Sequence, residues 1–117
     1  MEFRTDTPIY LQIATHIKEQ IMSGSLSYGD KLPSVREYSL LFEVSALTMQ
    51  RALAQLDAEG IIQAKRGIGN FVLSDCRENL EARMVDQQVQ EFVAKMRNVG
   101  LSTEFILEKV KEALGNG

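Results

Sequence analysis

Several basic side chains in this sequence stand where they could bind a phosphate or another anion. Arg36 lies in the segment Ser-Val-Arg-Glu of residues 34–37, which has the spacing of a helix-capping box. A helix amino terminus attracts anions, and an arginine there adds a charged contact through two parallel hydrogen bonds. Lys65 and Arg66 are the chain's only pair of adjacent basic residues, and a glycine follows them. The alternative is a solvated charge in each case, or for Arg36 an ion pair with Glu37.

The helical segment between these two groups offers hydrogen-bonding side chains on one face. Gln50 can hold an adenine through two hydrogen bonds, and Arg51 can hold a guanine or a phosphate. Leu47 can contact a thymine methyl group if it faces solvent. The alternatives stay open here: a solvated face for Gln50 and Arg51, and a core position for Leu47. Lys31 is either one more phosphate contact or a solvated lysine.

The remaining reactive side chains show no catalytic or metal-binding pattern. His16 has no second His or Cys at ligand spacing, and no set of nucleophile, base and acid can be recognised. Cys76 is the single cysteine, which excludes an intrachain disulfide and a Cys-based zinc site. Gly67 and Gly69 lack the third glycine and the following helix of a dinucleotide-binding fingerprint. We expect no enzyme, no cofactor and no metal site.

Length and composition indicate one globular domain, or one small domain with an appendage. The chain has 117 residues, of which 44% are apolar and 25% charged, and a net charge of −3. Basic residues do not dominate either part of the chain, so a nucleic-acid site has to come from a local cluster. No apolar run reaches the ~20 residues of a membrane span, and no secretory signal opens the chain. We therefore expect a cytoplasmic protein.

Periodicity and turn signals predict a mainly α-helical fold with a small β-hairpin. Capping residues, glycine stops and β-branched runs mark the ends of its elements. We expect a first helix from Thr7-Pro8 to Gly24, with Thr7 as its cap, then a turn at Gly29-Asp30 and an extended stretch 31–33. A second helix follows from Ser34 to 42–43, and a third from Ser45 to Gly60. Strands 61–65 and 70–73 come next, joined by the turn 66–69. A helix-turn-helix followed by a hairpin is the order of a winged helix.

Residues 75–117 are predicted to form a separate helical tail. Apolar residues recur there at steps of four and three, a heptad-like seam, up to a break at Gly100. Ser102 then caps a second helix with its own apolar face. Two short helices cannot bury both faces, so we expect a symmetric partner to cover them. The residues expected in this dimer interface are Val85, Val89, Phe92, Met96, Val99, Phe105, Ile106 and Val110.

A set of motifs across residues 7–73 resembles the GntR family of bacterial winged-helix repressors. They are Pro-Ile-Tyr-Leu-Gln-Ile-Ala at 8–14, Gly-Asp-Lys-Leu-Pro-Ser-Val-Arg-Glu at 29–37, Val-Ser at 44–45, Thr-Met-Gln-Arg-Ala-Leu at 48–53, Glu-Gly-Ile-Ile at 59–62 and Arg-Gly-Ile-Gly-Asn-Phe-Val at 66–72. The short tail is similar to that of the YtrA subfamily, where it serves dimerisation. The chain is too short for the aminotransferase-like domain of the MocR branch, so the resemblance implies no pyridoxal phosphate.

The resemblance also implies roles for single residues. Arg36 matches a DNA-contacting arginine, residues 66–67 match the wing tip, and Thr48 with its neighbours matches the recognition helix. The chain departs from the family at Ala46 and Leu47, where polar or basic residues are usual, which implies a different operator. The full set of expected DNA-binding residues is Ser34, Arg36, Ala46, Leu47, Thr48, Gln50, Arg51, Lys65, Arg66 and Gly67.

The expected function is a sequence-specific DNA-binding regulator of transcription, a repressor that binds a near-palindromic operator as a homodimer. Residues 1–74 form its winged helix-turn-helix domain and residues 75–117 its dimerisation tail. The alternative is a winged-helix module for protein interaction that has lost DNA binding, favoured by the negative net charge and the apolar Ala46-Leu47 pair. A small-molecule effector is left open as a further partner, and no membrane partner is expected.

Overall fold

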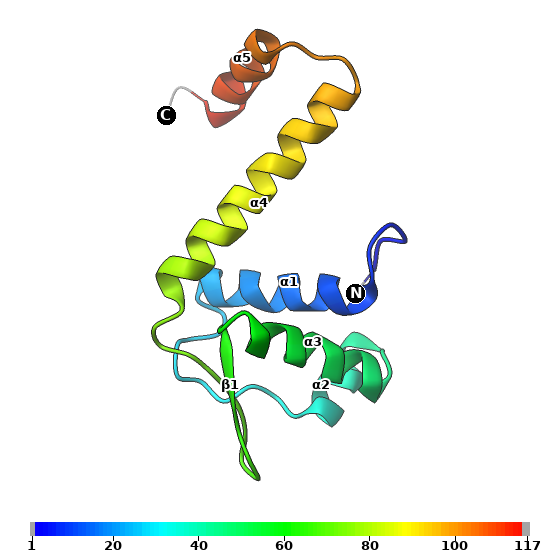
Figure 1. Ribbon diagram of the computed structural model, residues 1–117, viewed down its shortest axis with the longest axis vertical. Helices are drawn as coiled ribbons and strands as arrows, with labels where there is room; N and C mark the ends of the chain where they lie inside the picture. Colours follow the sequence, from blue (N-terminus) through cyan, green and yellow to red (C-terminus); the bar gives the residue numbers. More distant parts are fainter. Residues whose placement is uncertain (1, 116–117) are drawn as a thin grey trace. The chain divides into compact units, whose positions relative to one another are not determined.

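The computed structural model describes residues 2–115, apart from the side chain of Asn79. Figure 1 shows helices α1 (Ile9–Ser23), α2 (Val35–Phe42) and α3 (Ala46–Ala58), strands β1 (Ile62–Lys65) and β2 (Gly69–Val72), and helices α4 (Arg77–Asn98) and α5 (Thr103–Leu114). The predicted order of three helices, a hairpin and two further helices is confirmed. The chain divides into two compact units, of which the first ends at Leu80 and the second begins at Glu81.

The core of the first unit lies between α1 and α3. The four-residue spacing on α1 places Ile13, Ile17 and Ile21 on one buried stripe. On α3 the buried stripe includes Met49 and Leu56, neither of which is exposed to solvent. This packing leaves the opposite face of α3 free for other contacts.

Serine side chains cap the amino termini of α2 and α3, as the sequence predicted. Ser34 Oγ accepts a hydrogen bond from the Glu37 amide at 3.1 Å, and the Glu37 carboxylate accepts one from the Ser34 amide at 3.2 Å. Ser45 Oγ accepts from the Thr48 amide at 3.1 Å at the start of α3. Between the two helices Glu43 has a left-handed backbone, with φ of 57°, which ends α2 and turns the chain.

The predicted cap of α1 is wrong. Pro8 occupies the N-cap position, and no side chain caps the helix there. Instead Gln12 Nε2 donates to the carbonyl oxygens of Thr7 and Arg4, both at 2.8 Å, while Gln12 Oε1 accepts from the Arg4 amide. A glutamine one turn inside the helix therefore holds the segment before it. The capping pattern of the sequence does not indicate this contact.

The hairpin is antiparallel, and each strand differs by one residue from the prediction: β1 begins at residue 62 rather than 61, and β2 spans 69–72 rather than 70–73. Ile62 pairs with Val72, and Gly69, which the sequence placed in the turn, pairs with Lys65 and begins β2. The turn is closed by a hydrogen bond from the Ile68 amide to the Lys65 carbonyl at 2.9 Å.

The chain before α2 adds a third, irregular edge to this hairpin. The amide of Gly29 donates to the Val72 carbonyl at 2.8 Å, and the Val72 amide donates to the Asp30 carbonyl at 2.9 Å. The Leu32 amide donates to the Asn70 carbonyl at 2.8 Å. Residues 29–32, here called the strap, therefore hydrogen-bond to β2 and lead directly into α2.

A partly buried ion pair joins α1 to the end of α3. Lys18 Nζ lies 2.8 Å from Glu59 Oε1, and the lysine as a residue is only 9% exposed. Gln55 Nε2 donates to the other carboxylate oxygen of Glu59 at 2.9 Å. The two helices that form the core are thus also held together by a charge-assisted contact.

The hydroxyl of Tyr38 is buried without a hydrogen-bond partner among the described residues. An unpartnered buried hydroxyl costs stability, because it has lost its water without compensation. We therefore expect Tyr38→Phe to raise the free energy of unfolding by about 1 kcal/mol, measured by urea denaturation near neutral pH. A loss of stability in this variant would contradict the absence of a partner.

The same substitution should change how stability depends on pH. Burial raises the pKa of Tyr38 from 10.0 to about 12, because the phenolate would lose its hydration. The folded state therefore keeps the proton after the unfolded state has released it. The contribution of this group to the free energy of unfolding is therefore constant below pH 10.0 and falls as the pH rises towards about 12. The Tyr38→Phe variant should lack this part of the alkaline loss.

The second unit contains most of α4 and all of α5. Gly100, with φ of 83°, follows the end of α4, and Ser102 caps α5 by accepting from the Phe105 amide at 3.2 Å. The break and the cap are both where the sequence placed them. In the predicted seam before Gly100, Met96 is half-buried, and the exposed residues are Val85, Val89, Phe92 and Val99. On α5, Ile106 is buried, Val110 is half-buried and Phe105 is exposed.

Candidate nucleic-acid interface

The two faces of α3 differ in exposure as the sequence predicted. Met49, Ala52, Leu53 and Leu56 are buried against the core. Ala46 and Gln50 lie on the exposed face, and Leu47 there is 58% exposed. The alternative that Leu47 is a core residue is therefore excluded, and a leucine in solvent on this helix is available for an apolar contact.

Thr48 is less free than the other candidate residues on α3. Its side chain is half-buried, and its hydroxyl oxygen accepts a hydrogen bond from Ser45 Oγ at 3.0 Å. The threonine hydroxyl proton remains able to donate to an external acceptor. Thr48 can therefore donate one further hydrogen bond from a fixed position.

Arg51 lies on a different part of the α3 surface from the core-facing residues. It lines an open hollow of about 350 Å³ together with Tyr10, Ala54 and Gln55. The side chain of Tyr10 is half-buried and borders the hollow. Arg51 therefore stands beside the first turn of α1.

The start of α2 presents its polar side chains to solvent. Ser34 and Arg36 are exposed, and the Ser34 hydroxyl is engaged in the capping box. The Glu37 carboxylate accepts from the Ser34 amide, and no ion pair joins it to Arg36 in the described part of the chain. This leaves the arginine free to meet an anion at the helix amino terminus.

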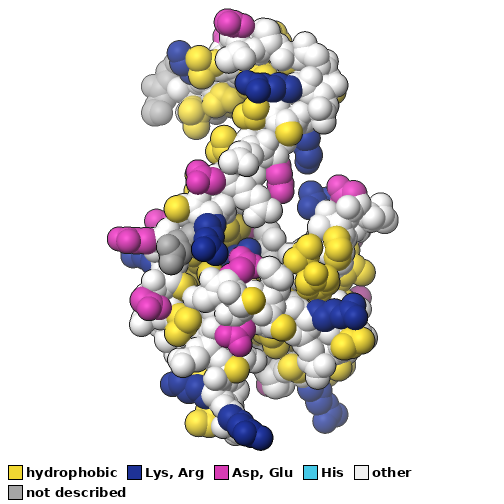
Figure 2. Space-filling model, in the orientation of Figure 1, with side chains coloured by type: hydrophobic (Ala, Val, Ile, Leu, Met, Phe, Trp, Pro, Cys, Tyr) yellow, Lys and Arg dark blue, Asp and Glu magenta, His cyan; other side chains and the backbone are white. Residues whose placement is uncertain are grey.

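The hairpin tip carries the basic pair that the sequence singled out. Lys65, Arg66 and Gly67 are all exposed. Gly67 has a φ of 76°, which explains why a glycine stands in the turn. Lys65 Nζ lies 4.6 Å from the centre of the Phe71 ring, a cation–π distance. Figure 2 shows Lys and Arg side chains gathered at the end of the molecule that carries this tip.

These three parts belong to one compact unit and offer complementary chemistry. The exposed face of α3 supplies an amide and an apolar side chain, which can read base edges. The start of α2 and the hairpin tip supply guanidinium and ammonium groups, which can hold phosphates. Figure 1 shows the hairpin and the beginning of α2 on the same side of α3 in this view.

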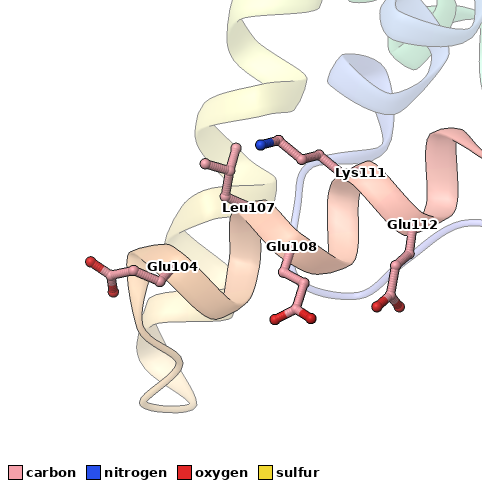
Figure 3. Close-up of a pocket in the computed structure, with 5 residues that line it drawn as sticks. All are labelled: Glu104, Leu107, Glu108, Lys111 and Glu112. Carbon is pink, nitrogen blue, oxygen red and sulfur yellow. The ribbon is translucent and has the colours of Figure 1, made fainter.

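An open hollow lies on the surface of α5 in the second unit. This hollow, of about 490 Å³, is bordered by Glu104, Leu107, Glu108, Lys111 and Glu112, all on α5. Figure 3 shows Leu107 and Lys111 projecting from one side of the helix and Glu108 and Glu112 from the other. A surface formed by one helix gives a small molecule little burial, compared with the 70–90% of usual ligand sites.

Neither metal binding nor membrane insertion is supported by the described residues. Among residues 2–115 no group of three His, Cys, Asp or Glu side chains could hold a metal ion. No helix in this part of the chain has the length and apolar character needed to cross a membrane. Cys76 is buried, and burial raises the pKa of its thiol, so the reactive thiolate is disfavoured.

A recognition helix with an exposed polar face, preceded by a capped helix and followed by a basic hairpin, defines a winged helix-turn-helix protein. The model of the bacterial regulatory proteins of the gntR family matches residues 9–72. The chain belongs to this family and is a DNA-binding regulator of transcription.

Relatives of the chain agree with this assignment along most of its length. It is 33% identical over 112 residues to the HTH-type transcriptional repressor YtrA of Bacillus subtilis, covering 93% of this chain and 86% of that protein. A GntR family transcriptional regulator from Listeria monocytogenes has a similar structure, with a TM-score of 0.81, 38% identity, and coverage of 94% and 98% of the two chains. The predicted family and fold class are therefore confirmed.

A third comparison includes nucleic acid. The DNA-binding domain of AraR in complex with operator ORX1 is 28% identical and has a TM-score of 0.57. The match covers 61% of this chain and 92% of that one.

Proposed function

We propose that this protein binds a near-palindromic operator as a homodimer and represses transcription there. The observation that carries the proposal is the exposed face of α3, with Gln50 on it, in the same compact unit as the exposed basic hairpin tip. The operator in the AraR complex and the repressor name of the Bacillus relative support it. Because its target is bacterial DNA, the protein acts in the cytoplasm.

The dimer is proposed to form through the second unit. On α4, Val85, Val89 and Phe92 recur at heptad spacing and remain exposed in the single chain. Exposed apolar side chains in a row are costly in water, and a second copy related by a two-fold axis covers them. A dimer of this kind matches the symmetry of a palindromic site.

In this proposal the residues divide into those that read bases and those that hold the backbone. Gln50 and Leu47 read base edges from α3, with Ala46 and Thr48 beside them. Arg36 and the hairpin tip hold phosphates or enter the minor groove. We assign no effector and no catalytic role. The alternative of a protein-interaction module without DNA binding is set aside, because the chain belongs to a family of DNA-binding regulators.

We expect two substitutions to separate these roles. Gln50→Ala should cost about 1–3 kcal/mol per symmetric contact on the operator and relax base preference at one position of each half-site. Arg36→Ala should weaken binding to all duplexes alike and reduce the dependence of log affinity on log salt by about one unit per lost contact. Binding-site selection and salt titrations with the wild type and both variants measure these effects.

The wild type provides the control for the whole proposal. If it binds no duplex with salt-dependent affinity, the proposed function has failed. If Gln50→Ala keeps the same base preference while Arg36→Ala changes it, the roles are inverted and the docking proposed here is wrong.

A further inference from the structure

We infer that one face of the wing, formed by Lys31 of the strap and Lys65 of β1 around Phe71, binds a phosphate of the DNA backbone. This inference rests on the proposed function and adds to it a residue outside the helix-turn-helix and the hairpin tip. It assigns Lys31, which the sequence left open between a phosphate contact and a solvated lysine, to the interface.

The pairing of the three segments places both lysines on the same face. Lys31 is opposite Phe71 across one side of β2, and Gln63 is opposite Phe71 across the other side. Directly opposite residues share a face, and so do residues two apart along a strand. Lys65, which is opposite Gly69, therefore lies on the face that also carries Lys31 and Phe71.

Contacts with the central strand hold both side chains over β2. A Cβ atom added to Gly69 would lie 2.9 Å from Lys31 Cε, so the lysine crosses directly over this glycine. From the other edge, Lys65 Nζ lies 4.6 Å from the centre of the Phe71 ring. Two long side chains from opposite edges thus converge on the same stretch of β2. Side chains already held in place lose less entropy when a ligand binds.

The charge on this face is not neutralised in the described part of the chain. Neither Lys31 nor Lys65 has a carboxylate within ion-pair distance there. Asp30, the acidic neighbour of Lys31, accepts from the Ser27 amide at 2.9 Å instead. Two exposed ammonium groups over one strand repel each other, and an anion between them relieves that repulsion.

The expected partner is the phosphate backbone next to the wing tip. The strap leads into α2, where Arg36 is exposed, and β1 leads into the tip, where Arg66 is exposed. A phosphate on the lysine face would therefore extend the row of backbone contacts between these two arginines. Such contacts position the domain without reading sequence.

The first test replaces the charge and keeps the aliphatic stem. Lys31→Met should reduce the slope of log affinity against log salt by about 0.9 per phosphate, or by about 1.8 for a dimer. When the salt concentration rises fourfold, the affinity of the variant for DNA should therefore fall roughly 10-fold less than the affinity of the wild type. The probe is a duplex recovered by binding-site selection with the wild-type protein, and base preference should not change. Lys111→Met, on α5, is the matched control and should leave the slope unchanged.

A double-mutant cycle tests the geometry of Lys31 over Gly69. In Gly69→Ala the added methyl group displaces the flexible end of Lys31, while the backbone strain at a φ of 142° is the same whether or not the lysine is present. Gly69→Ala should therefore weaken DNA binding more in the wild type than in the Lys31→Ala background, by about 3-fold or more. Thermal melting of all four proteins checks that each is folded.

The possible outcomes distinguish this inference from the proposed function. If the wild type binds the duplex with a steep salt dependence and Lys31→Met has the same slope, the inference is overturned and the proposed function stands. Additive effects of Gly69→Ala and Lys31→Ala would overturn the geometry in the same way. If the wild type binds no duplex at all, the proposed function itself has failed.

Discussion

A protein that ends at Leu80 should fold as a winged helix and bind a palindromic operator about 10²- to 10⁴-fold more weakly than the full chain. The first compact unit ends at this residue and has its own core between α1 and α3. Removing the second unit takes away the proposed dimer contacts but none of the proposed DNA contacts. The loss therefore comes from effective concentration, because the second half-site is no longer held close to the first.

The position of the cut matters for this experiment. Cys76 and Leu80 are both buried in the first unit, so a chain that ends at Ser74 would lose apolar side chains from that unit as well. Circular dichroism and thermal melting should show a cooperative fold for the chain that ends at Leu80. Its affinity for a single half-site should equal that of the full chain. Equal affinities of the two chains for the palindrome would contradict dimeric binding.

Glu59→Ala should lower the free energy of unfolding by about 3 kcal/mol. The substitution leaves Lys18, only 9% exposed, without the carboxylate that lies 2.8 Å from its ammonium group. A buried charge without its partner is far more costly than the pair is favourable. The variant also leaves the Gln55 amide without its acceptor at the end of α3. Urea denaturation, evaluated as midpoint and slope, measures the loss.

The chain offers a matched control in the exposed pair of Arg4 and Asp6. Their charged atoms are 3.6 Å apart, and their side chains are 59% and 69% exposed. Asp6→Ala should change stability by less than about 1 kcal/mol, because water and salt screen such pairs. Similar losses for Glu59→Ala and Asp6→Ala would show that the Lys18 ammonium is not buried in solution.

Most of the fold follows from local signals in the sequence. The capping box of Ser34 and Glu37, the cap at Ser45 and the glycine after α1 each act within a few residues, so their pattern is visible in the chain itself. The four-residue spacing of isoleucines gives the buried face of α1 for the same reason. The family motifs then indicate how these elements are combined.

The features that the sequence did not reveal depend on contacts between distant residues. Lys18 and Glu59 are 41 positions apart, and neither residue type indicates burial. Residues 31–33 were predicted as extended, but the strand that pairs with the strap lies about 40 positions further along the chain. Gln12 holds the segment before α1, although a helix-interior glutamine is ordinarily a solvated residue. Propensity describes each segment by itself, whereas these contacts appear only once the segments pack.

The candidate site was predicted in outline, and its details required the fold. Periodicity could not decide whether Leu47 faces the core, because residues near a helix amino terminus have few neighbours that fix their orientation. Arg51 was grouped with Gln50 by sequence, but the packing of α1 places it beside Tyr10. The roles of these residues in binding remain predictions that the substitutions above address.

The strap joins the hairpin to the start of α2. Its three amide hydrogen bonds with β2 restrain movement of the wing relative to the segment that leads into the helix with Arg36. In the proposed complex the spacing of the contacts from these parts is set by the backbone, so we expect the protein to adjust little to a groove of another width. The DNA has to deform instead, at an energy that depends on the flexibility of its base steps. We therefore expect operators to be distinguished partly at base pairs that no side chain touches.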